Sequence, residues 1–165
     1  MTKNRLEAFS DGVFAIVITL LILDVKLPVV AYNDLYESLV QLLPNIGIYV
    51  LSFLLIGMYW VFHHQSLRLI SEVNSVLLWL NIFFLLFLSF LPFPTSLMGR
   101  YPSRTIPIVV YGVNLLLVNL IGYAMLLYLR GNKRLASSAF TEQTFKLSSR
   151  TYLVVNGLYV VCIVL

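Results

Sequence analysis

The sequence carries little charge, since Asp, Glu, Lys and Arg together make up only 11% of its 165 residues. A soluble domain carries roughly twice that share, and hydrophobic residues here reach 60%, with a mean hydropathy of +0.92. This composition excludes an ordinary soluble domain and predicts a membrane protein. The apolar runs are long, unlike the alternating segments of ~10 residues in a membrane β-barrel, which favours an all-α polytopic helical bundle.

Cysteine is almost absent as well, and the motifs of common enzymes are missing. The lone Cys162 lies in an apolar run, so the chain has no disulfide framework. We find no Walker loop, dinucleotide loop or nucleophile–base pair, and therefore expect neither an enzyme nor a cofactor. The net charge of +4 does not indicate a nucleic-acid partner, because the basic residues lie at the ends of apolar runs and in loops.

The apolar runs predict four membrane spans and the beginning of a fifth, at about 5–25, 39–62, 73–90, 106–129 and 151–165. Pro92 and Pro94 are expected to end the third span and to lead into a loop. The polar stretch 130–150 is expected to be an interfacial loop that is partly helical. Because fifteen residues fall short of the ~20 that cross a bilayer, we expect residues 1–165 to form a single channel domain cut within its fifth span, with a sixth to follow.

The basic residues also predict how the chain is oriented. Three lie on the side opposite the amino terminus, and eight lie on the same side as it: Lys3, Arg5, Arg68, Arg130, Lys133, Arg134, Lys146 and Arg150. Since Lys and Arg collect on the cytoplasmic side, the amino terminus is expected in the cytoplasm.

The first span combines a polar start with an apolar stripe. On a helix, Ile16, Leu20 and Leu23 fall on one stripe, and Thr19 lies beside it. Taken on the residues alone, such a stripe more often faces lipid or a packed helix than a pore.

Adjacent histidines in the second span raise the question of a metal site. Neighbouring residues on a helix point about 100° apart, so His63 and His64 chelate one ion poorly. No Cys, Asp or Glu follows in the next few positions to complete a site. We therefore expect no bound metal.

The polar start of the first span carries a family resemblance. Arg5, Phe9, Ser10 and Asp11 match the Arg-x-x-x-Phe-Ser-Asp signature of the lysosomal-type potassium channels, the transmembrane protein 175 family. The similarity continues through YWVFHHQ (59–65) and LNIFFLLFLSFLPFPTSLMG (80–99). The chain resembles a bacterial member with one repeat, which implies a multi-pass protein of the bacterial inner membrane.

The resemblance implies a function for the apolar stripe. In this family the first helix lines the pore, and large aliphatic side chains at the positions of Ile16, Leu20 and Leu23 form a hydrophobic constriction, with Thr19 next to it. The chain is thus expected to be a potassium-preferring cation channel with a hydrophobic gate and only transient K⁺ in its pore. Because two-repeat relatives work as dimers, a homotetramer is expected. No T-V-G-Y-G-like carbonyl filter is present, so any preference for K⁺ must come from the constriction and its neighbours.

The remaining polar residues are expected to hold the helices together. Buried polar groups need partners, and the candidates for a structural polar network are Arg5, Phe9, Ser10, Asp11, Trp60, His63, His64 and Asn81. Asn114, Asn119 and Asn156 are expected to form hydrogen bonds between helices.

Two other functions remain open at this stage. One is a proton- or cation-coupled secondary transporter that uses Asp11 and the histidines, although the inverted halves typical of such carriers are not evident. The other is a membrane subunit that conducts nothing.

Overall fold

In a bilayer the backbone must satisfy its own hydrogen bonds, and the long apolar runs therefore fold as helices. The computed structural model describes residues 2–26, 29–102 and 104–164. Its elements are α1 (Lys3–Leu20), η1 (Leu21–Asp24), η2 (Tyr32–Asp34), α2 (Leu35–Arg68), α3 (Ser75–Ser89), α4 (Pro92–Arg100), α5 (Thr105–Gly131), η3 (Lys133–Leu135) and α6 (Glu142–Val164).

Four of these helical segments are long and apolar enough to cross a membrane: Lys3–Leu23, Tyr32–Arg68, Ser75–Arg100 and Thr105–Gly131. The prediction of an all-helical, multi-pass membrane protein is thus confirmed. Helix α6 is not among the four, because its first turns carry the polar residues that the sequence placed in a loop. The expected interfacial loop is therefore shorter than predicted and ends at Thr141. The last residue of the expected fifth run, at position 165, lies outside the described residues.

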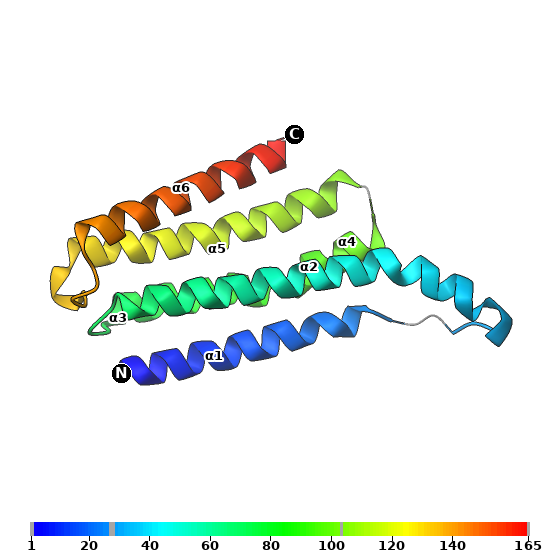
Figure 1. Cartoon of the computed structure of the whole chain (residues 1–165), viewed down its shortest axis with the longest axis horizontal. Coiled ribbons are helices and arrows are strands. Elements are labelled where there is room, and N and C mark those ends of the chain that lie inside the picture. Colours follow the sequence, from blue (N-terminus) through cyan, green and yellow to red (C-terminus); the bar gives the residue numbers. More distant parts are fainter. Residues whose placement is uncertain (1, 27–28, 103, 165) are drawn as a thin grey trace.

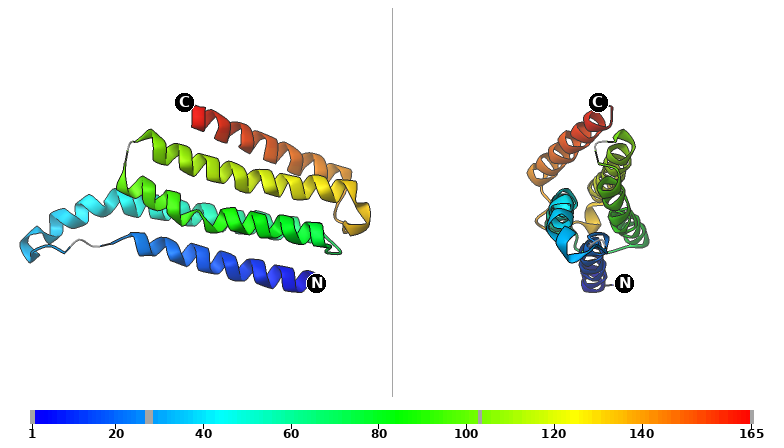
Figure 2. Two further views of the ribbon diagram at one scale, coloured as in Figure 1. Left: turned by 180° about the vertical axis from the view of Figure 1, so that it is seen from behind. Right: turned by 90° about the vertical axis from the view of Figure 1, so that its right-hand side faces the viewer.

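The helices run alongside one another in an up-and-down bundle (Figure 1). Helix α1 lies at one edge against α2 and α3, while α5 packs between α3 and α6. The end-on view in Figure 2 shows α1 and α6 at opposite edges of the bundle. This arrangement leaves one side of α1 without a partner in its own chain.

The amino terminus, the α2–α3 turn and the α5–α6 connection lie at the same end of the bundle (Figure 1). The α2–α3 turn is bound to the α5–α6 connection through Ser71 N–H to Leu135 O (2.8 Å) and Ser137 N–H to Leu69 O (2.9 Å). The segments that carry the eight basic residues named above all belong to this end.

Two boundaries differ from the sequence prediction. The loop expected after Pro92 is helical, because a proline in the first turn of a helix loses no hydrogen bond and has the right φ; Pro92 begins α4. Helix α2 runs on to Arg68 rather than ending near residue 62, so that His63 and His64 lie within the helix. Pro44 lies inside α2, as its tenth residue.

Candidate functional site on the first helix

Helix α1 has two sharply different faces. One face is buried against α2 and α3 and carries Leu6, Ser10, Phe14 and Val17. The spacing of these residues, four, four and three, is that of one side of an α-helix.

The face next to the buried one is apolar yet exposed. Ile16, Leu20 and Leu23, the predicted constriction residues, are 61%, 43% and 62% exposed in the single chain. Phe9 belongs to the same uncovered side and is half exposed, so it takes no part in the buried contacts. The structure therefore keeps the predicted stripe together and turns it away from the core of its own chain.

Thr19 lies beside the stripe with its hydroxyl already bonded. Its Oγ1 donates to the backbone oxygens of Ala15 (3.0 Å) and Ile16 (2.9 Å), which share the single hydroxyl hydrogen. The oxygen keeps its lone pairs, so the side chain is exposed as an acceptor and not as a donor.

A continuous chain of hydrogen bonds joins three helices beneath the buried face of α1. His63 Nε2 on α2 lies 2.7 Å from Asn81 Oδ1 on α3, Asn81 Nδ2 donates to Ser10 Oγ (3.0 Å), and Ser10 Oγ donates to Leu6 O (2.9 Å). Since Asn81 Oδ1 can only accept, Nε2 is the ring nitrogen of His63 that carries a hydrogen here. All three side chains are buried.

Aromatic rings enclose His63 on the other sides. The ring of His63 stacks on Phe84, with centroids 4.9 Å apart, and lies 5.5 Å from the ring of Phe14. Neither phenylalanine was named from the sequence. Their spacing from His63 and Ser10 along the chain gives no signal, because they meet only when α1, α2 and α3 pack.

Asp11 makes a separate contact at the surface. Trp60 Nε1 donates to Asp11 Oδ1 (2.8 Å), and the Trp60 ring stacks on His64 with centroids 6.1 Å apart. Both members of the hydrogen bond are exposed in the single chain. Arg5 is exposed too and forms no ion pair with any acidic side chain that the structure describes.

The predicted network is thus divided in two, with a buried chain through His63 and a surface pair through Asp11. His63 joins the first and His64 the second. The structure brings Arg5 and Phe9 to neither.

The expected inter-helix bonds of three asparagines are wrong in part. Among the described residues, Asn114 Nδ2, Asn119 Nδ2 and Asn156 Oδ1 are buried with no hydrogen-bond partner. Other polar pairs join the helices instead: Tyr59 and Tyr159 hydroxyls lie 3.2 Å apart.

The described part of the chain contains no group of three His, Cys, Asp or Glu side chains that would hold a metal ion. His63 is buried in the bundle and His64 lies toward Trp60, so the two imidazoles do not converge.

Comparison with known proteins identifies a family and relatives that are similar in sequence. The family described as "Endosomal/lysosomal potassium channel TMEM175" matches residues 5–92. A potassium channel of Chryseobacterium sp. (strain P1-3) is 39% identical over 126 residues, which cover 76% of this chain and 64% of the relative. A potassium channel of Streptomyces collinus is 44% identical over 100 residues, covering 60% of this chain and 48% of the relative. The chain thus spans about half to two thirds of the length of these relatives.

A solved structure resembles the whole helical arrangement. The crystal structure of a lysosomal potassium-selective channel TMEM175 homolog from Chamaesiphon minutus superposes with a TM-score of 0.85 at 29% sequence identity. The match covers 98% of this chain and 85% of that chain.

Proposed function

This chain belongs to the TMEM175 family of endosomal/lysosomal potassium channels, and from that premise we propose that it is a potassium-preferring cation channel that assembles as a homotetramer. In each subunit α1 lines the pore. Ile16, Leu20 and Leu23 form its hydrophobic constriction.

The observation that carries the proposal is the uncovered apolar face of α1. Large aliphatic side chains stay exposed on a helix whose other face is almost fully buried. Because α1 lies at the edge of its own bundle, this face is free to meet the same face of other copies.

One pore helix per chain does not enclose a pore, so several copies must surround an axis. Two-repeat relatives that work as dimers would supply four such helices, and four copies of this one-repeat chain supply the same number. The closed assembly also covers the stripe that a single chain leaves open.

Stacked rings follow from the helix geometry. From Ile16 to Leu20 the α-helical rise gives a spacing of about 6 Å. The chain then enters η1, and a 3₁₀ helix repeats every three residues with a rise of about 2 Å, so Leu23 lies in line with Leu20 about 6 Å further on. Three apolar rings in line make a barrier to a hydrated ion whose height depends on the width and wetting of the rings.

Selectivity would arise at the edge of these rings. Thr19 adds four hydroxyl oxygens next to the constriction, each with its hydrogen donated to the backbone. Such oxygens suit a partly dehydrated cation as ligands.

The polar contacts are proposed as scaffolding. The His63–Asn81–Ser10 chain fixes the buried face of α1 to α2 and α3, and the Trp60–Asp11 bond fixes its polar start to α2. This arrangement sets the rotation of α1 and therefore which residues face the axis.

The proposed location is the bacterial inner membrane with the amino terminus in the cytoplasm. The apolar part of α6, from Thr151 on, would be the fifth span.

Recording from the purified protein in planar bilayers tests the channel proposal. We expect unitary current steps. With a K⁺ solution on one side of the bilayer and a Na⁺ solution on the other, the reversal potential should shift toward the equilibrium potential of K⁺. Coupled flux without unitary steps would point to a carrier. Silence from a correctly assembled tetramer would point to a non-conducting subunit.

Substitution of Ile16 by Asn tests the constriction. A polar side chain in a narrow apolar ring favours water, so we expect a larger unitary conductance and a reduced preference for K⁺ over Na⁺. Leu20→Asn and Leu23→Asn should act in the same direction.

Ile22→Asn is the matched control, because Ile22 is also exposed but lies one position off the stripe. Val17 is unsuitable for this purpose, since it is only 2% exposed and faces the core. An effect of Ile22→Asn without one of Ile16→Asn would show that a different face of α1 lines the pore.

A further inference from the structure

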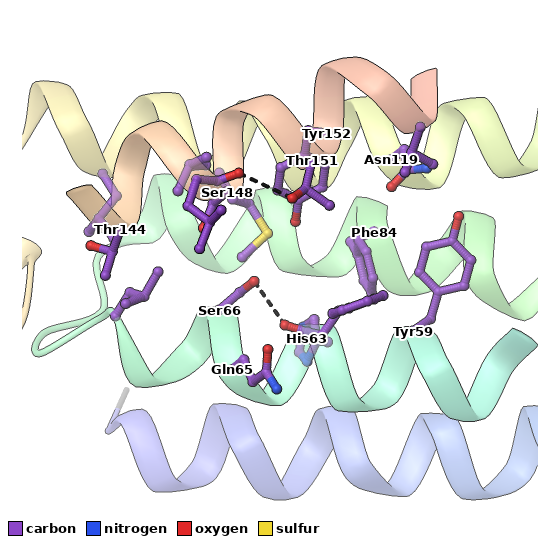
Figure 3. A pocket seen from close by; sticks show the side chains of 18 of the residues that line it. Tyr59, His63, Gln65, Ser66, Phe84, Asn119, Thr144, Ser148, Thr151 and Tyr152 are labelled. Atoms are coloured by element: carbon purple, nitrogen blue, oxygen red, sulfur yellow. Dashed lines mark hydrogen bonds between the residues drawn. The ribbon is translucent and has the colours of Figure 1, made fainter. Parts of the chain in front are cut away.

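A cavity of about 460 Å³ lies between α2, α5 and α6 (Figure 3). Helix α6 packs along α5 but makes few contacts with α2, and the cavity occupies the space between these two helices. The Tyr59–Tyr159 hydroxyl pair lies at one end of the cavity. At the other end, toward the α2–α3 turn, the lining residues include Thr144, Leu69 and Ile70.

The lining is uncharged and largely apolar. None of the described residues that line the cavity is Asp, Glu, Lys or Arg. The apolar residues of the lining include Phe62, Met125, Leu126 and Val155. A charged ligand would find no counter-ion here, and an isolated charge in such surroundings is costly. The cavity therefore suits a neutral, lipophilic molecule, and its volume is within the range of small-molecule sites.

One polar group in the lining has no partner. Asn119 is only 6% exposed, and its Nδ2 has no hydrogen-bond acceptor among the described residues. Figure 3 shows its side chain pointing from α5 toward Tyr59. Buried amide N–H groups nearly always have an acceptor, so this donor marks a place where a ligand oxygen fits.

We propose that the cavity binds a neutral lipophilic molecule with a carbonyl, ether or hydroxyl oxygen, which accepts a hydrogen bond from Asn119 Nδ2. The apolar body of the ligand packs along Phe62, Met125 and Val155. Water alone would satisfy Asn119 but would leave most of this apolar wall wet, which the site does not favour.

The position of the cavity connects it to α1. His63 forms part of the cavity wall and is also the first member of the chain through Asn81 to Ser10. A bound ligand therefore touches the residue that helps to fix the rotation of α1. This modulatory consequence rests on the proposed channel function, whereas the binding itself does not.

Photolabelling tests the binding without any recording of current. The full chain, in lipid nanodiscs, is irradiated with a diazirine-bearing decanol, and cross-links are located by mass spectrometry. We expect cross-links at Met125, Leu126 or Val155. Asn119→Leu should lower them about fivefold, the size of effect that follows from one lost hydrogen bond.

Asn114→Leu is the matched control. Asn114 is on the same helix, equally buried and equally unpaired at Nδ2, but it does not line the cavity. Labelling of this variant should stay at the wild-type level. A diazirine-bearing decane, which lacks the hydroxyl, should label weakly and be insensitive to Asn119→Leu.

Three results would overturn the proposal. One is cross-linking confined to outward-facing residues of α5 such as Leu120 and Leu127, which are exposed. Another is equal labelling of the Asn119→Leu and wild-type cavities. The third uses Met125→Trp, which adds a bulky ring to the cavity wall, keeps Asn119 and serves if Asn119→Leu does not assemble. Labelling at Leu126 or Val155 that stays at the wild-type level after this change would rule out the site. A failure of this binding test would not affect the test of the channel proposal, which depends on current recordings alone.

Discussion

Ser10, Asn81 and His63 form a chain of buried hydrogen bonds. Because each bond in the chain depends on the next residue, the contribution of each residue to stability depends on the other two. His63 Nε2 donates to Asn81, Asn81 donates to Ser10, and Ser10 returns its hydrogen to the backbone of α1. Removing any member leaves a buried donor or acceptor without a partner, which costs more than the bond itself contributes. We propose that these residues act as one unit that holds α1 in a single rotation.

Ser10→Ala should lower the free energy of unfolding by about 1–3 kcal/mol, because it leaves Asn81 Nδ2 buried without an acceptor. Denaturant titration in detergent, followed by circular dichroism, measures the change. Ser89→Ala is the matched control, since the Ser89 hydroxyl is exposed and donates to Leu86 O of its own helix; its effect should stay within about 0.5 kcal/mol. Equal effects of the two changes would contradict the structural role of the chain.

The Trp60–Asp11 bond is different in kind, because both of its side chains are exposed in a single subunit. Trp60→Phe keeps the aromatic ring and removes only the N–H donor. We expect a smaller fraction of tetramer in size-exclusion chromatography with light scattering, since α1 loses one attachment to α2.

The matched change for this test is Trp79→Phe on α3, whose ring is exposed and lies tilted against Phe83 of the same helix. It should leave the tetramer fraction unchanged. If Trp60→Phe assembles as well as wild type and only conductance changes, Asp11 is better described as part of the ion path.

At the scale of the elements, α5 and α6 pack closely because glycines on α5 make room for side chains of α6. A Cβ built on Gly122 would lie 2.8 Å from the Tyr152 hydroxyl and 3.0 Å from its ring. The rigid Tyr152 ring cannot move aside as easily as the end of a flexible side chain could. By contrast, the Cβ of a substituted Gly57 on α2 would meet nothing within 4 Å.

Gly122→Ala should therefore separate α6 from α5 and lower stability by about 1–3 kcal/mol, the usual cost of overpacking. Limited proteolysis of the 132–141 connection should become faster. Gly57→Ala should be neutral or stabilising by up to ~1 kcal/mol, because alanine is the better helix former. Faster cleavage of the Gly57 variant, with the Gly122 variant unaffected, would show that the helices pack differently.

On the scale of the whole molecule, one end of the bundle carries most of the Lys and Arg residues and the other end carries few. The amino terminus, the α2–α3 turn and the α5–α6 connection share the basic end. This arrangement places most Lys and Arg on one side of a membrane, and the proposed orientation assigns that side to the cytoplasm. The proposed pore axis runs between these two ends.

Cysteine accessibility measures the orientation. In a Cys162→Ser background a cysteine at Ser138, in the α5–α6 connection, should react with a membrane-impermeant maleimide only after the cells are opened. A cysteine at Tyr36, at the opposite end of the bundle and exposed, should react in intact cells. The reverse pattern would place the amino terminus outside.

Part of this protein follows from the sequence alone, because it depends on local chemistry. Long apolar runs without charge must be helices in a bilayer, and the basic residues predict which end of the bundle faces the cytoplasm. The stripe of Ile16, Leu20 and Leu23 also needs only the 3.6-residue period, and the structure turns that stripe outward. The family was likewise readable from Arg5, Phe9, Ser10 and Asp11, and the family match confirms it.

Only the tertiary structure decided which side chains meet. His63 and His64 are neighbours in the sequence, and the packing of α2 against α3 determines that His63 is the one that reaches Asn81. Asp11 bonds to Trp60, 49 positions away, and not to Arg5. Asn119 lacks a partner because the facing positions of α2 and α6 leave a cavity there. Such contacts join residues that are distant along the chain, so no local period or motif specifies them.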